Sequence, residues 1–293
     1  MTDEPGAGSA EPEIRMFDGA EIRIYEDPEA TSRAAAEAIA SALHGAIDER
    51  GRADWATTGG STPVAIYKHL ASDPLRHAVP WEDVHVWWGD DRYVPRDHPL
   101  SNVLPLDQVL VSATARAGLS GSGSDAALVE TEYDPGVYIP PANIHAPRMT
   151  DAIGRAAGPE WVAHEYDAEL RGAGLDVDEA GFPSFDVLFL GVGPDGHLLS
   201  VFPGSALFGS KAWASAVPAP SHVEPHVARV SLNPAVVAAA RLAMPVLHGE
   251  GKAAILASVF GSERDPQRWP AQLARRDGAI WFIDRAAASQ LPR

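Results

Sequence analysis

A carboxylate and an imidazole lie two residues apart, shortly after an apolar run that has one acid near its start. Residues 185–190 form that run, and Asp195-Gly196-His197 follows it. If the run is a central strand of an α/β sheet, the pair lies beyond the carboxyl end of the strand, where such sheets bind ligands. A histidine held in one tautomer by an aspartate can act as a general base. The same spacing also fits a turn in which Asp195 caps a helix and His197 has no catalytic part.

The turn that holds this pair also matches a dinucleotide-binding pattern. Residues 191–196 read Gly-Val-Gly-Pro-Asp-Gly, which fits G-x-G-x-x-G directly after a strand. Pro194 inside the turn argues against a nucleotide, and the nearest acid for a ribose, Glu224, is poorly placed. We therefore expect no nucleotide cofactor.

An earlier glycine turn offers a second kind of site. Residues 59–63 read Gly-Gly-Ser-Thr-Pro and lie between a short extended segment and a helical pattern. Backbone N–H groups, two hydroxyls and the positive end of a helix dipole can bind a phosphate there without added basic charge. The lysine of a Walker loop is absent. The alternative is a simple helix start with Pro63 at the first helical position.

Two cations occupy positions that call for an anion. Lys252, one of only three lysines, follows Gly249-Glu250-Gly251 at a predicted helix start. A lysine there opposes the helix dipole, so it is either solvated or placed to meet an anion. Arg92 follows Asp90 and Asp91 directly. It forms either a local ion pair or a clamp on a substrate.

The charge balance excludes several classes of partner. The 293 residues contain 23 Lys and Arg against 40 Asp and Glu, a formal charge of −17, with no basic block. Nucleic acid and anionic membrane surfaces both require clustered positive charge. No apolar run approaches the roughly 20 residues of a membrane helix. Because the start of the chain also lacks the features of a secretory signal, we expect a cytoplasmic protein.

Cysteine and histidine usage limits the chemistry further. The chain has no cysteine, which excludes disulfide scaffolds, cysteine-ligated metals and thiol nucleophiles. His222 and His226 have the best metal-ligand spacing, but Pro225 between them prevents a continuous helix. No G-x-S-x-G elbow of a serine hydrolase is present. We expect no metal site.

Strand patterns alternate with helical ones, which predicts an α/β protein with a largely parallel sheet flanked by helices. Thr31 is the predicted N-cap of the first helix, whose apolar positions recur every fourth residue from Ala35 to Ile47. The predicted strands are 21–25, 54–58, 84–88, 185–190, 229–232, 242–247 and 279–283, and the later helices are 64–71, 102–111, 160–171, 234–240 and 250–259.

Composition suggests a single large domain with one insertion. Residues 1–13 are small and acidic and predict a flexible tail, and residues 14–293 form the α/β domain. Within it, residues 112–141 are rich in Gly and Ser and predict a surface loop insertion.

Four segments in this order resemble the 6-phosphogluconolactonase family, in the superfamily that includes glucosamine-6-phosphate deaminase. The resemblance covers nearly the whole chain except the tail and the insertion. The segments are Thr58-Gly-Gly-Ser-Thr-Pro63; Trp88-Gly-Asp-Asp-Arg-Tyr-Val-Pro95 with Ser101-Asn102; 185–205 with Asp195-Gly-His197; and Arg229-Val-Ser-Leu232 with Gly249-Glu-Gly-Lys-Ala253.

The resemblance implies a modified Rossmann-type sheet and hydrolysis of 6-phospho-D-glucono-1,5-lactone to 6-phosphogluconate in the oxidative pentose phosphate pathway, without a metal or cofactor. It makes His197 the general base and Asp195 its support. The partner is then a small phosphorylated sugar lactone. The implied substrate- and phosphate-binding residues are Gly60, Ser61, Thr62, Asp90, Arg92, Arg229 and Lys252.

Two alternatives remain open, a glucosamine-6-phosphate deaminase or isomerase and a non-catalytic sugar-phosphate binding protein. The deaminases carry an acid five positions after the histidine, where this chain has Phe202, and Asp-Glu-Tyr where it has Asp90-Asp91-Arg92. The chain also lacks the lysine of a Ser-Pro-Lys-Pro-Pro-like stretch that lactonases usually carry. Either His222 or His226 takes its place, or fewer side chains hold the phosphate.

Overall fold

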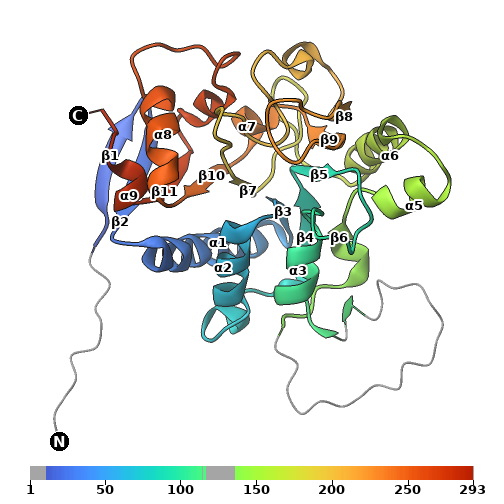
Figure 1. Ribbon diagram of the computed structural model, residues 1–293. Helices are drawn as coiled ribbons and strands as arrows, with labels where there is room; N and C mark the ends of the chain where they lie inside the picture. The colour runs from blue at the N-terminus through green and yellow to red at the C-terminus, as the bar shows by residue number, and fades with distance from the viewer. Residues whose placement is uncertain (1–10, 114, 117–135, 293) are drawn as a thin grey trace, which may run out of the picture.

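The computed structural model describes residues 11–113, 115–116 and 136–292. Its main feature is an eight-stranded sheet in which every neighbouring pair is parallel except β1 with β2. Figure 1 shows the strands in this order across the view: β1 (Glu13–Phe17), β2 (Ala20–Tyr25), β11 (Ile280–Asp284), β10 (Leu242–Leu247), β7 (Val187–Leu190), β3 (Ala53–Thr57), β4 (Val84–Trp88) and β6 (Ile144–His145). The predicted α/β fold with a largely parallel sheet is confirmed.

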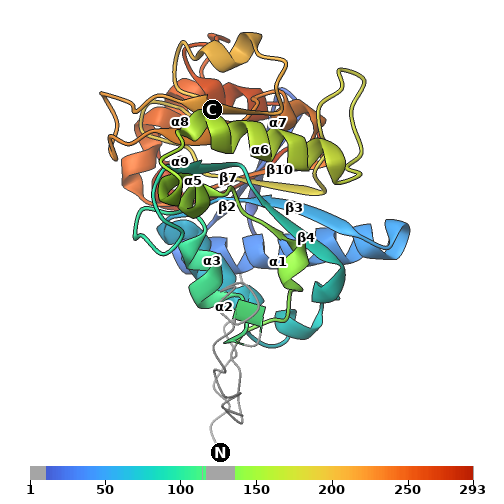
Figure 2. The ribbon, with the colours of Figure 1, turned by 90° about the vertical axis from the view of Figure 1, so that its right-hand side faces the viewer.

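Helices cover both faces of the sheet, as Figure 2 shows. One face carries α1 (Pro28–Arg50), α2 (Ser61–Leu70) and α3 (Leu104–Val109). The other carries α5 (Met149–Gly154), α6 (Pro159–Gly172), α7 (Val236–Ala239), α8 (Ala253–Val259) and α9 (Arg285–Ala288). Short 3-10 turns occupy Leu75–His77, Trp81–Asp83, Pro141–Asn143, Ala206–Gly209, Glu250–Lys252 and Pro270–Ala274.

The two-sided covering explains the apolar run that precedes Asp195. Side chains of a strand alternate between the faces of its sheet, so a strand covered on both sides must be apolar at every position. In β7, Val187 and Phe189 pack into the core cluster that contains α1 and α2. Leu188 and Leu190 pack into the opposite cluster, with α6 and α8. β7 is therefore a central strand, as its sequence predicts.

The first helix begins earlier than predicted. Asp27, not Thr31, is the N-cap of α1, because its carboxylate accepts a hydrogen bond from the Ala30 N–H at 2.8 Å. Thr31 lies in the first turn and donates its hydroxyl to the Asp27 carbonyl. The helix ends at Gly51, whose φ of 74° provides the left-handed cap that favours glycine.

Several other boundaries differ from the sequence prediction. Helix α2 begins at Ser61, so Pro63 is its third residue and not its first. Strand β1 begins at Glu13, a residue assigned to the tail, and forms an edge strand that the prediction missed. Residues 1–10, and residues 117–135 of the proposed insertion, lie outside the described residues.

A second sheet lies apart from the main one and was not predicted. It consists of β5 (Asp90–Arg92), β9 (Arg229–Leu232) and β8 (Ala214–Val217), all antiparallel. Asp90, Asp91 and Arg92 follow β4 after Gly89 and pair with β9 in this sheet. Strand 229–232 was predicted correctly, although not its partner strands.

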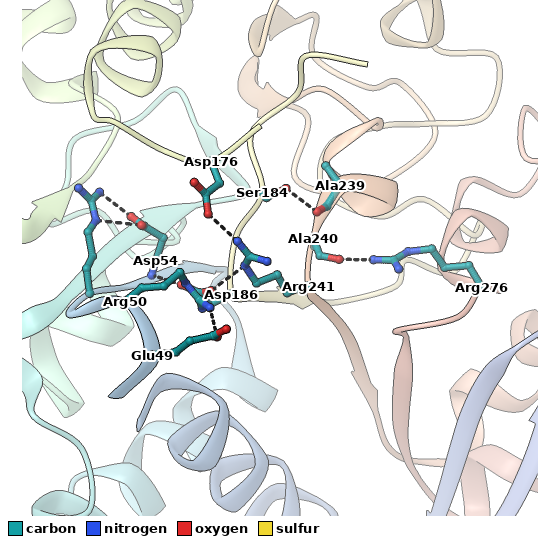
Figure 3. A network of polar contacts seen from close by, with 11 residues as sticks. Glu49, Arg50, Asp54, Asp176, Ser184, Asp186, Ala239, Ala240, Arg241 and Arg276 are labelled. Carbon is teal, nitrogen blue, oxygen red and sulfur yellow. Dashed lines mark hydrogen bonds and ion pairs between the residues drawn. The ribbon is translucent and has the colours of Figure 1, made fainter. Parts of the chain in front are cut away.

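A network of hydrogen bonds and ion pairs lies at the amino-terminal ends of the central strands (Figure 3). The Asp54 N–H donates to Asp186 Oδ2 at 2.8 Å, which joins β3 to the start of β7. Arg50 and Arg241 both contact Asp186 Oδ1, at 2.5 and 3.2 Å. Because the Asp186 carboxylate is paired with both arginines and with the Asp54 N–H, these polar groups have a structural role. No helix in the described part of the chain is both long and apolar enough to cross a membrane.

Candidate active site

The strand order brings the predicted site residues together at the opposite edge of the sheet. β10, β7, β3 and β4 are consecutive neighbours and all parallel, so the segments that follow them emerge side by side. Together with Arg229 of β9 they line a cavity of about 330 Å³. Ligands of parallel α/β sheets bind at this kind of edge. Of the predicted site residues, the following line the cavity: Gly60, Ser61, Thr62, Asp90, Arg92, His197, Arg229 and Lys252.

The turn after β3 presents the start of α2 to the cavity. Gly60 is the N-cap with a φ of 109°, a backbone conformation that glycine adopts without strain, and no side chain caps the helix. The N–H groups at such a helix start have no partner within the helix and attract anions. Gly59 packs so closely on Asn102 that an added β-carbon would lie 2.5 Å from the Asn102 α-carbon. The turn is thereby held against the segment that follows β5.

Two arginines face one another at the second wall of the cavity. Arg92 and Arg229 are directly paired across the β5–β9 ladder, although like charges in this position repel. Arg92 Nη1 donates to the Leu100 carbonyl at 2.9 Å, and Arg229 Nη2 to the Pro225 carbonyl at 3.3 Å. The Nε atoms of both are buried and have no hydrogen-bond partner among the described residues. An anion in the cavity would supply acceptors and offset the repulsion.

Lys252 contributes the third cation. Its ammonium donates to the Val192 carbonyl at 2.7 Å, which anchors it beside the turn after β7. Burial lowers the pKa of Lys252, and attraction by Asp195 opposes that shift. Lys252 is the last residue of the 3-10 turn Glu250–Lys252 and directly precedes α8.

His197 and Asp195 form a direct pair. His197 Nδ1 lies 2.5 Å from Asp195 Oδ1, and the His197 backbone N–H donates to the same oxygen at 3.1 Å. Burial alone would raise the pKa of Asp195, but the hydrogen bonds from His197 and His222 hold it well below its ordinary value. An ionised carboxylate can only accept, so Nδ1 carries a proton; in the neutral imidazole, Nε2 then keeps its lone pair. The geometry is therefore that of a potential general base.

Asp90 also lines the cavity, but its carboxylate is engaged within the protein. Oδ2 accepts a hydrogen bond from Ser200 at 2.5 Å, and Oδ1 accepts one from Asn102 at 3.1 Å. These bonds connect β5 to the segment after the His197 turn. Asp90 thus contacts the cavity while holding two of its walls together.

Two residues of the site were missed from the sequence. His248, directly after β10, lines the cavity and lies 3.0 Å from the Thr62 hydroxyl. Phe202 packs on His197, with ring centroids 4.7 Å apart. The His248 position, one residue before Gly249, could have suggested a role, whereas Phe202 carries no polar group and gave no signal beyond its difference from the deaminases.

The two candidates for the missing lysine take different places. His222 Nε2 lies 2.9 Å from Asp195 Oδ2, and His222 is not among the residues that line the cavity. His226 contacts the Pro220 carbonyl and Glu224 within its own loop. The structure thus directs neither imidazole to the cavity or to the glycine turn at Gly60.

Three comparisons with known proteins agree on one family. The model of the family described as glucosamine-6-phosphate isomerases/6-phosphogluconolactonase matches residues 26–282. A 6-phosphogluconolactonase of Streptomyces coelicolor is 30% identical over 278 residues, covering 95% of this chain and 97% of the relative. One of Synechocystis is 34% identical over 252 residues, covering 84% and 88%. The structure of the 6-phosphogluconolactonase from Trypanosoma cruzi has a TM-score of 0.76 at 22% identity, covering 96% of this chain and 99% of that one, which is a likeness of fold.

Proposed function

This chain belongs to the family of glucosamine-6-phosphate isomerases and 6-phosphogluconolactonases, and we propose that it hydrolyses 6-phospho-D-glucono-1,5-lactone to 6-phosphogluconate. The observation that carries the proposal is that His197, which is paired with Asp195, lines the same cavity as the glycine turn at Gly60. The proposal includes a reaction without a metal ion, in the cytoplasm.

The phosphate of the lactone binds at the start of α2. The backbone N–H groups of Ser61 and Thr62 and their hydroxyls donate to its oxygens. Arg92, Arg229 and Lys252 supply the balancing charge from the other walls. A dianion held at one end of the sugar places the ring across the cavity, so binding energy is used to orient the carbonyl carbon.

His197 then performs the proton transfers. Nε2 accepts a proton from water as the water oxygen attacks the lactone carbonyl carbon and forms a tetrahedral intermediate. When the intermediate collapses, the bond between that carbon and the ring oxygen breaks, and the ring oxygen takes the proton from Nε2. Asp195 stabilises the imidazolium that exists between the two transfers. The net change is addition of one water to one lactone.

Phe202 favours the lactonase over the deaminase. This ring lies against His197 at the position where deaminases carry an acid. Ring opening and protonation of an amine need further acid and base groups, and an apolar side chain supplies none. A non-catalytic binding protein would have no need for a carboxylate that fixes the tautomer of a cavity histidine.

The decisive experiment is a hydrolysis assay with freshly prepared 6-phosphogluconolactone and subtraction of the spontaneous rate. We expect His197→Ala to lower kcat by about 100-fold or more, with KM little changed. His164→Ala, at an exposed helical position, is the matched control. Full activity in His197→Ala would reject the catalytic assignment. Ammonia release from glucosamine 6-phosphate at a higher rate than lactone hydrolysis would instead assign a deaminase.

A further inference from the structure

The carboxylate of Asp195 is shared by two histidines from distant segments. Oδ1 lies 2.5 Å from His197 Nδ1, and Oδ2 lies 2.9 Å from Nε2 of His222, in the loop between β8 and β9. Because an ionised carboxylate accepts but cannot donate, both histidines must present an N–H to it. The structure therefore contains a chain of three groups, from the exposed His222 through Asp195 to His197 in the cavity.

We propose that His222 is a positioning residue, which orients Asp195 and through it holds His197 in the tautomer that leaves Nε2 free. This inference rests on the proposed lactonase function. His222 does not line the cavity. It acts on the reaction only through the aspartate, so it affects the proton transfers and not substrate binding.

The hydrogen bonds of Asp195 give the physical reason. Its Oδ1 accepts from both the ring and the backbone of His197. Its Oδ2 has one hydrogen-bond partner in the described part of the chain, which is His222. The last torsion of an aspartate side chain is broad and weakly restrained. A donor on the second oxygen therefore fixes the plane of the carboxylate, and with it the direction from which Oδ1 meets His197.

Phe202 keeps the outer histidine in place. Its ring contacts both imidazoles, with centroids 4.7 Å from His197 and 5.7 Å from His222. Only the outer member is exposed: the side chain of His222 is 51% exposed, against 17% for Asp195 and 13% for His197. An exposed ion pair by itself contributes little to stability. Because His222 packs on the buried Phe202 ring and hydrogen-bonds to Asp195, we assign it a role in positioning the carboxylate and not in stability.

A matched pair of variants separates the hydrogen bond from the bulk of the side chain. His222→Gln can place an amide N–H near the position of Nε2, and His222→Met has similar length without a donor. We expect His222→Met to lower kcat for lactone hydrolysis by about 10-fold and to change KM by less than about two-fold. His222→Gln should recover most of the loss. Wild-type kcat in His222→Met would overturn the proposal.

The double variant shows whether His222 acts through Asp195. In an Asp195→Asn background the Met substitution should cause no further loss, because coupled residues are not additive. His226→Ala, in the same loop but without contact to Asp195, should keep wild-type kcat. An equal loss of kcat in His226→Ala, or a full further loss in Asp195→Asn, would assign the effect to the loop and overturn the proposal.

A measurement without substrate distinguishes this inference from the proposed function. The ¹⁵N chemical shifts of the His197 ring report which nitrogen carries the proton. We expect the Nδ1–H tautomer in the wild type and in His222→Gln, and a mixture in His222→Met. An unchanged tautomer in His222→Met would overturn the positioning role. A wild type that shows the expected tautomers but hydrolyses no lactone would refute the proposed function alone.

Discussion

The imidazole of His197 lies directly against the backbone of Gly193. A β-carbon added at Gly193 would come within 2.0 Å of His197 Cε1 and 2.1 Å of Nδ1. The Gly193 N–H also donates to the His197 carbonyl at 2.8 Å, which closes the turn around the ring. The glycine that made this turn resemble a dinucleotide site therefore has another purpose here. It leaves room for the histidine to reach Asp195.

Gly193→Ala should displace the His197 ring. Because the clash involves the ring itself, the ring has to leave its place beside Asp195. We expect kcat to fall by about 100-fold, as a shift of about 1 Å costs in other active sites. Steady-state kinetics and a thermal unfolding curve test this together. Gly191→Ala adds a methyl in the same turn where no atom lies within 4 Å, so it should lose far less. Equal losses in the two variants would refute the explanation.

Phosphate should stabilise the protein through the facing arginines. The pairing of Arg92 with Arg229 places two cations together, and an anion between them would offset their repulsion. We expect inorganic phosphate to raise the Tm of the wild type, since a ligand of the folded state stabilises it. In Arg229→Met the apparent Kd for phosphate should rise by about 10- to 100-fold, because a hydrogen bond to a charged group contributes about 1.5–3 kcal/mol.

The control for this measurement is Arg96→Met. Arg96 is held by Asp107 through two hydrogen bonds and does not line the cavity. Its loss should leave the effect of phosphate on Tm unchanged. A wild-type response to phosphate in Arg229→Met would show that the anion binds elsewhere.

Substrate binding should weaken at alkaline pH because of Lys252. Burial lowers the pKa of this lysine, so its positive charge is lost as pH rises, at a lower pH than for an ordinary lysine. A phosphate monoester is already a dianion in that range, with a second pKa of about 6. Calorimetric titration with 6-phosphogluconate should show a rising Kd with pH in the wild type. The Lys252→Met variant should bind more weakly at neutral pH and lack this alkaline loss; a persistent loss would implicate another group.

Asp91 makes stability depend on pH with the opposite sign to most carboxylates. Burial raises its pKa from 3.8 to about 7, although hydrogen bonds from the N–H groups of Asn102 and Arg92 oppose the shift. Between these values the folded chain holds a proton that the unfolded chain has released. The contribution of Asp91 to the free energy of unfolding is therefore largest at low pH and falls as pH rises toward 7.

Asp91→Asn keeps the acceptor oxygen and removes the charge. We expect the variant and the wild type to unfold with similar free energies near pH 4. Above pH 7 the variant should be more stable, by at most about 4 kcal/mol for a shift of this size. Urea unfolding at several pH values measures the difference between the two proteins. A difference that is the same at all pH values would mean that the pKa of Asp91 is the same in the folded and the unfolded chain, and would refute the prediction.

The sequence by itself determined the local units of this protein. The unbroken apolar run of β7 indicated a strand covered on both faces, because alternating side chains point to opposite sides. The glycine turn at residues 59–60 indicated a helix start open to an anion, because cap chemistry is local. The motifs around Asp195 and His197 indicated the family, which the comparisons show. The roles of the site residues remain proposals.

Only the tertiary structure decided which of these units meet. β5 and β9 are more than 130 residues apart in the chain, so no local pattern could predict that Arg92 faces Arg229. The same holds for His222, whose sequence position suggested a phosphate ligand and whose place in the fold is beside Asp195. Motifs whose residues lie close together in the sequence depend on local backbone geometry, which neighbouring residues determine. Contacts across the sheet depend on strand order, and strand order is set by the packing of the whole core.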